Sequence, residues 1–164
     1  MHHSGHHTHW KLVRYFQSAD VLELTGLTRS QLREWSSRDR RNLVIADVEP
    51  EGPGRHALFK WQTVLALRLL KEMQTRFAVE VAAWAPAINS LRQVLDGQPF
   101  QSLWRSSVCF PSCGQVELIE LNSAREFISG IVLPLDPHLL VIATKLCIPP
   151  PDQLPLFPAV AVRR

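Results

Sequence analysis

The sequence predicts an α+β fold with four to five helices and one β-hairpin in residues 15–97, followed by a small β-rich region in residues 98–164. Amphipathic segments with helix caps fill the first part, whereas apolar, β-branched runs separated by prolines fill the last third. Residues 1–14 precede them as a flexible, histidine-rich tail. The 164 residues, 46% of them apolar and 20% charged, fit one medium domain or a small domain with an appendage.

The composition excludes several broad classes. The longest apolar stretch, residues 127–144, is interrupted by Gly130, Pro134 and Pro137, so a helix cannot cross a bilayer there. Residues 1–9 are polar and lack the pattern of a signal peptide. Three cysteines are too few for a disulfide framework. We therefore expect a soluble protein in a reducing, cytoplasmic setting, without a membrane partner.

The N-terminal tail carries five of the seven histidines. Histidine-rich tracts bind metals, but this one resembles an affinity tag or an adventitious metal binder more than a physiological site. It predicts no fixed metal centre.

Two short helices follow the tail. Ser18 is a good N-cap for the first, and Gly26 is a typical terminator. Thr28 and Gln31 have the spacing of a capping box, which starts a second helix over residues 29–37. Two short helices joined by a tight glycine turn are typical of a helix-turn-helix.

The second helix has two different faces. Leu32 and Trp35 are three residues apart and predict a buried face, which places Arg29, Ser30, Arg33 and Ser37 on the outer face. Residues 28–41 contain five arginines and only two acidic residues, although the net charge of the whole chain is only +3. A basic, capped helix of this kind suits a polyanion such as DNA. A solvated amphipathic helix gives the same pattern and remains the alternative.

A β-hairpin is expected next. Residues 43–46 are β-prone, residues 49–54 form a turn and residues 57–59 return as a second strand. A hairpin directly after a helix-turn-helix is a wing, and Arg55 and His56 would lie where a wing meets backbone phosphates. The acids of the outgoing arm, Asp47, Glu49 and Glu51, would have to point away from the nucleic acid.

Two longer helices complete the first part. Residues 60–74 have the widest apolar stripe in the chain. Residues 79–95 contain Pro86, so this segment is either one kinked helix or two helices, the later one over residues 87–95. Gly97 and Pro99 then mark the predicted domain boundary.

This order of parts resembles the MerR-type helix-turn-helix, a winged-helix DNA-binding domain of bacterial transcription regulators and related excisionase-like proteins. The resemblance covers residues 15–96 and includes the motif Leu32-Arg33-Glu34-Trp35, the segment 52–59 and the phenylalanine-led segment 77–81. It implies that the second helix enters the major groove and that Arg33 and Arg55 contact the DNA backbone.

The last third is predicted to be β-rich. Residues 115–121 alternate polar and apolar side chains, and residues 126–133 and 138–144 are apolar runs, with a short helix near residues 123–127 and an extended tail after Pro149. Such a small sheet leaves edges that a second copy can cover, which predicts a homodimer. Cys109 and Cys113, with Cys147 or His138, form a candidate metal or redox group, but ordinary buried thiols fit the pattern better.

The leading hypothesis is a sequence-specific double-stranded DNA-binding protein, a dimeric bacterial transcription regulator of the cytoplasm and nucleoid. Arg29 and Ser30 are expected at base edges, and Arg33 and Arg55 at phosphates. The alternatives are a protein-interaction adaptor that uses its C-terminal region and an excisionase-like architectural protein. No catalytic motif is evident, so neither enzymatic activity nor a cofactor is expected. The predicted DNA contacts are Thr28, Arg29, Ser30, Arg33, Ser37, Arg38, Arg40, Arg41, Arg55 and His56.

Overall fold

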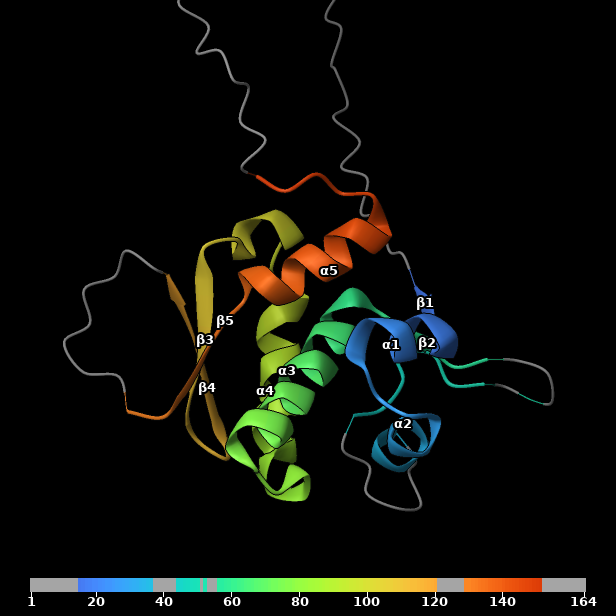
Figure 1. The fold of residues 1–164 in the computed structure, drawn as a ribbon, viewed down its shortest axis with the longest axis horizontal. Coiled ribbons are helices and arrows are strands. Elements are labelled where there is room, and N and C mark those ends of the chain that lie inside the picture. Colours follow the sequence, from blue (N-terminus) through green and yellow to red (C-terminus); the bar gives the residue numbers. More distant parts are fainter. Residues whose placement is uncertain (1–14, 37–43, 51, 53–55, 121–128, 152–164) are drawn as a thin grey trace, which may run out of the picture.

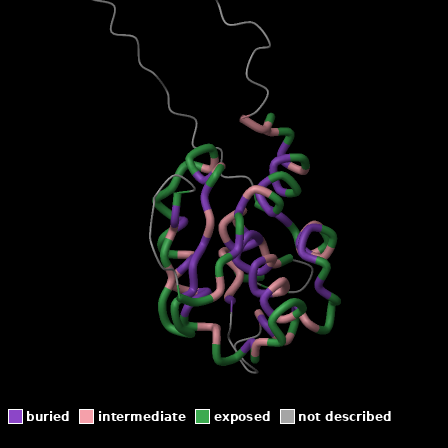
Figure 2. The backbone as a smooth tube through the Cα atoms, turned by 60° about the vertical axis from the view of Figure 1, so that its left-hand side comes forward, coloured by how far each residue is buried: buried purple, intermediate pink, exposed green. Residues whose placement is uncertain are grey.

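A computed structural model describes residues 15–36, 44–50, 52, 56–120 and 129–151. These residues form a mixed α and β fold with five α-helices and two small antiparallel sheets, which confirms the α+β class. In Figure 1 the three-stranded sheet lies on one side, α3 and α4 form the middle, and α1 and α2 lie on the opposite side. Buried residues line the surfaces where these layers face one another, and exposed residues follow the outer turns (Figure 2).

The N-terminal helices lie where the sequence predicts them. Helix α1 spans Ser18–Thr25 and α2 spans Arg29–Ser36. A short antiparallel sheet joins β1 (Phe16–Gln17) to β2 (Leu58–Phe59), so the chain before α1 pairs with the chain before α3. This pairing ties the two ends of the segment that contains α1 and α2 to each other.

Helices α3 (Trp61–Phe77) and α4 (Val81–Asp96) form the central layer. Eight residues of α3 are buried, because α3 packs against α1, α4 and α5. Its apolar stripe is therefore as wide as three neighbours require. The predicted helix over residues 60–74 is confirmed and continues for one further turn.

Pro86 does not divide α4 into two helices. Proline removes one backbone donor and crowds the preceding turn, which loosens the helix locally. The N–H of Ala87, the next residue, donates to the carbonyl oxygen of Cys113 at 3.1 Å. The helix thus passes through Pro86 as one element and gains a hydrogen bond to the turn that joins β3 to β4.

The C-terminal region contains the 3-10 helix η1 (Phe100–Leu103), three strands and a helix. The strands are β3 (Ser106–Ser112), β4 (Gln115–Glu120) and β5 (Ile131–Pro134), in the spatial order β4-β3-β5. Helix α5 (Asp136–Leu146) follows β5 directly and packs on α3. Gly130 has a φ of 133°, and a Cβ there would overlap the backbone of Phe110 and lie 2.8 Å from the Cα of Pro111.

Three sequence-based assignments need correction. Residues 138–144 are helical, not a strand, because Asp136 and Pro137 start a helix whose inner face is buried on α3. The predicted strand over residues 43–46 is absent from its described part, since residues 44–46 have no regular structure and Val48 alone bridges Leu58. The N-cap of α1 is Gln17, not Ser18, because Ser18 already has helical geometry. Strand β4 confirms the prediction for residues 115–121, whose last residue lies outside the described part.

One hydrophobic core runs through both predicted domains. Buried residues from Phe16 to Leu146 belong to a single cluster that includes members of α1, α3, α4, β3 and α5. The helical part and the sheet therefore share their interior, and the boundary predicted at Gly97 falls in the connection after α4. Among the described residues, no helix is both long and apolar enough to cross a membrane.

Candidate nucleic-acid interface

The turn between α1 and α2 is held by local hydrogen bonds. Gly26 adopts a left-handed φ of 69°, and its N–H donates to the carbonyl oxygen of Leu22 at 3.0 Å. The hydroxyl of Thr25 donates to the carbonyl oxygen of Val21 at 2.6 Å and accepts the N–H of Leu27 at 3.3 Å. A left-handed residue at this position ends the helix, and glycine adopts it without steric cost. The direction in which the chain enters α2 is thus fixed.

Thr28 and Gln31 form the predicted capping box. The N–H of Gln31 donates to Thr28 Oγ1 at 3.1 Å, and the N–H of Thr28 donates to Gln31 Oε1 at 3.1 Å. These two bonds satisfy backbone donors that a helix N-terminus otherwise leaves to water. Helix α2 therefore begins at Arg29, as expected from the sequence.

The two faces of α2 differ in the predicted way. Leu32 and Trp35 are 6% and 3% exposed and join the hydrophobic core. Arg29, Ser30 and Arg33 are exposed. Within the part of the chain that the structure describes, neither arginine forms an ion pair or a hydrogen bond. Their guanidinium groups are thus available to an external anion.

The other predicted DNA contacts differ in how the structure treats them. Thr28 and His56 are exposed. Thr28 lies at the start of α2, and His56 lies two residues before β2. Ser37, Arg38, Arg40, Arg41 and Arg55 lie outside the described residues. The structure therefore places Arg29, Ser30 and Arg33 on α2 and Thr28 directly before its first residue.

The segment that returns from α2 is anchored at three points. The N–H of Val44 donates to the carbonyl oxygen of Trp35 at 3.0 Å. Val48 and Leu58 exchange two backbone hydrogen bonds, of 3.0 and 2.9 Å. Between these anchors, Asp47 Oδ2 accepts the N–H of Lys60 at 2.7 Å. A single bridge, rather than two full strands, thus forms the base of the predicted wing.

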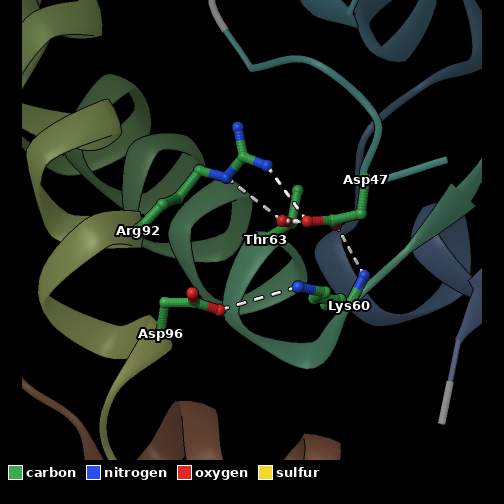
Figure 3. A network of polar contacts seen from close by, with 5 residues as sticks. All are labelled: Asp47, Lys60, Thr63, Arg92 and Asp96. Atoms are coloured by element: carbon green, nitrogen blue, oxygen red, sulfur yellow. Dashed lines mark hydrogen bonds and ion pairs between the residues drawn. The ribbon is translucent and has the colours of Figure 1, made fainter. Parts of the chain in front are cut away.

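Asp47 belongs to a polar network that includes α3 and α4 (Figure 3). Its Oδ2 also accepts the hydroxyl of Thr63 at 2.6 Å, and its Oδ1 accepts Nη2 of Arg92 at 3.2 Å. Nε of Arg92 donates to Thr63 Oγ1 at 3.1 Å, and Nζ of Lys60 lies 3.6 Å from Asp96 Oδ1. Asp47 therefore points into the fold, as the DNA-binding hypothesis required of it. Asp47, Lys60, Thr63, Arg92 and Asp96 are among the residues that line an open pocket of about 230 Å³.

A second buried contact joins α5 to α3. His138 is 6% exposed, and its Nε2 lies 2.6 Å from Glu72 Oε2. Glu72 also pairs with Arg76. Burial lowers the pKa of His138, an effect that the carboxylate of Glu72 opposes and the positive charge of Arg68 reinforces. The pKa of Arg68 is likewise lowered by burial.

The cysteines do not form the candidate metal group. Cys109 is buried in β3, whereas Cys113 and Cys147 are exposed, and no disulfide joins them. Among the described residues, no three His, Cys, Asp or Glu side chains are close enough together to hold a metal ion. The interpretation as ordinary buried thiols thus fits Cys109 alone.

Sequence reasoning missed both polar networks. Asp47 and Arg92 are 45 residues apart, and Glu72 and His138 are 66 apart, so no local spacing connects either pair. For the first network, the available signal in the sequence was one acid, Asp47, within the otherwise apolar residues 43–48. An acid next to buried residues needs a partner, but the sequence does not say which one.

Comparison with known proteins adds no family to this geometry: no protein-family model matches the chain, and no curated protein matches it significantly.

Proposed function

We propose that the protein binds double-stranded DNA through α2. The observation that carries this proposal is the outer face of α2, where Arg29, Ser30 and Arg33 are exposed while Leu32 and Trp35 fix the helix to the core. The positive end of the α2 dipole is its N-terminus, where Thr28 and Arg29 lie. A short helix with this charge distribution fits the major groove of a duplex.

The arrangement around α2 also supports this function. The capping box and Gly26 hold α2 at a defined angle to α1, as a helix-turn-helix requires. The bridge of Val48 to Leu58 joins the two arms of the segment between α2 and α3, which supports the assignment of this segment as a wing. The resemblance to the MerR-type domain, with transcription regulation in bacteria as its implied role, belongs to this proposal.

The proposed partner beyond DNA is a second copy of the chain. The strands β4 and β5 are edges of the three-stranded sheet within the described residues, and paired edges are a common route to dimers. A dimer would carry two copies of α2. Sedimentation of the free protein and of its duplex complex measures the number of copies in each.

The decisive experiment removes the charge of α2 without changing its buried face. We expect the double variant Arg29→Gln and Arg33→Gln to lose at least about tenfold in affinity for a random duplex, with the salt dependence reduced by at least the one phosphate contact of Arg33. Both side chains are exposed, so the thermal unfolding midpoint should stay within about a degree or two of wild type.

The matched control is the double variant Lys71→Gln and Lys145→Gln, which removes two positive charges from α3 and α5. Lys145 takes part only in exposed ion pairs with α1, which contribute little to stability. This control should keep most of the wild-type affinity. Equal loss in both double variants would mean that total charge, rather than α2, holds the duplex, and unchanged affinity of the α2 variant would reject the proposal.

A further inference from the structure

The chain between α2 and α3 has little regular structure of its own. Residues 45–47 belong to no helix or strand, yet they connect the Val44 anchor on Trp35 to the Val48 bridge on Leu58. The position of Val48 therefore depends on what holds Asp47, whereas Leu58 is also held by its pairing with Gln17 of β1.

Asp47 is held from three directions. Its carboxylate accepts hydrogen bonds from the backbone of Lys60, the hydroxyl of Thr63 and the guanidinium of Arg92. Lys60 is the N-cap of α3 but makes no side-chain cap, so Asp47 supplies an acceptor at that end of the helix. The carboxylate thus connects the return segment to the first turn of α3 and to α4.

Burial makes this connection specific. The side chain of Asp47 is 11% exposed and that of Arg92 is 21% exposed, and Thr63 is buried. Hydrogen bonds between charged partners are stronger than those between neutral groups, and removal of one partner from a largely buried pair leaves the other uncompensated. Thr63 also accepts Nε of Arg92, so the three side chains form a closed triangle (Figure 3).

We propose that Asp47, Thr63 and Arg92 are positioning residues for DNA binding: they fix Val48 and the return segment relative to α2, so that this segment and α2 can contact one duplex. This inference rests on the proposed function of α2. Asp47 and Thr63 act through the backbone that they hold and do not themselves touch the DNA.

The test exploits the sign of a charge. Asp47→Asn removes a negative charge, so simple attraction to a polyanion would strengthen duplex binding. Positioning predicts the opposite, because the amide side chain forms a weaker contact with Arg92 and the return segment loosens. We expect the affinity for a random duplex to fall on the order of tenfold, with a smaller salt dependence.

Hydrogen exchange of the free protein tests the same inference without DNA. Hydrogen exchange of the Val48 and Leu58 amides should accelerate on the order of tenfold in Asp47→Asn, whereas the amide of Leu32 in α2 keeps its wild-type rate. Thr63→Val, which changes no charge and little volume, should shift both readouts in the same direction. Lys71→Gln, a variant outside the network, should change neither exchange rate.

The outcomes separate this inference from the proposed function. If the wild-type protein does not bind the duplex, or if the Arg29 and Arg33 variant binds normally, the proposed function fails and the inference with it. If the α2 variant loses binding but Asp47→Asn and Thr63→Val bind as tightly as wild type, the inference alone is overturned. Faster exchange with unchanged affinity would also overturn it, since the network would then be only structural.

Discussion

Helices α2 and α5 lie at opposite ends of the same fold and present opposite surfaces. Each buries one face in the hydrophobic core, and α5 packs on α3. The exposed residues of α2 include Arg29 and Arg33, whereas those of α5 are uncharged: Pro137, Leu140, Val141 and Thr144. Among the described residues, the exposed charge of α2 is thus positive and unpaired, whereas the one basic residue of α5, Lys145, is paired with Asp20 and Glu23 of α1.

The two helices also differ in how they are attached. Helix α2 is held by Trp35, Leu32 and its capping box, all within a few residues of one another. Helix α5 is held by distant partners, since His138 contacts Glu72 of α3 and Lys145 pairs with α1. Both helices are also anchored by buried apolar residues, Leu32 and Trp35 in α2 and Leu139 and Ile142 in α5. The difference lies in the polar contacts, which for α2 stay at the start of the helix and for α5 reach to α1 and α3.

The largest effect should come from the removal of the apolar anchor of α2. Trp35 is 3% exposed, so Trp35→Ala leaves a large cavity and should lower the free energy of unfolding by about 3–5 kcal/mol. Leu140→Ala, at a position of α5 that is 49% exposed, should cost about 0.5 kcal/mol or less.

Urea titration followed by circular dichroism measures both variants. If Leu140→Ala lowered the free energy of unfolding as much as Trp35→Ala does, the contrast between the two helices would be wrong. The outer face of α5 would then be covered by another molecule. Concentration dependence of the Leu140→Ala midpoint would then identify that molecule as a second copy.

A smaller effect tests the start of α2. Thr28→Ala removes the acceptor for the N–H of Gln31 and should lower the free energy of unfolding by about 1 kcal/mol. Thr28→Ser keeps the oxygen and should recover most of this loss. The same urea titration distinguishes them, and equal stability of the two variants would show that the cap contributes nothing.

The same contrast explains what the sequence could predict. Gly26, Thr28 and Gln31 lie within six residues of one another. Their capping patterns predict where α1 ends and α2 begins to within one or two residues. The long apolar period of α3 was equally informative. These elements follow from contacts between residues three or four apart, which a single sequence displays directly.

Helix α5 could not be predicted in this way. His138, Leu139, Leu140, Val141 and Ile142 are apolar or neutral on every side, so they show no period that separates a helix from a buried strand. Asp136 and Pro137 at its start were the available helix signal, but prolines there fit a turn between strands equally well. The packing on α3, which is a tertiary contact, decided the outcome.

Strand β3 escaped prediction for a related reason. It is the central strand of its sheet, and it contains Pro111, which normally argues against a central strand. The register with β4 shifts between Cys109 and Ser112, so Pro111 lies in the irregular part of the ladder. A bulge of this kind is visible only when the partner strand is known.

The smallest predicted effect concerns pH and the attachment of α5. Burial lowers the pKa of His138 below its ordinary 6.5, while Glu72 opposes the shift. The unfolded chain therefore takes up this proton at a higher pH than the folded protein does. Stability should be unaffected above about pH 7.5 and should fall as the pH drops below the ordinary value and through the lowered pKa.

His138→Gln isolates this contribution, because glutamine can still donate to Glu72 but does not titrate. The difference in unfolding free energy between wild type and His138→Gln should change between about pH 8 and about pH 5.5. A flat difference would mean that His138 is as easily protonated in the fold as in the unfolded chain. The contact with Glu72 would then offset the burial fully, and α5 would be held by a charged pair.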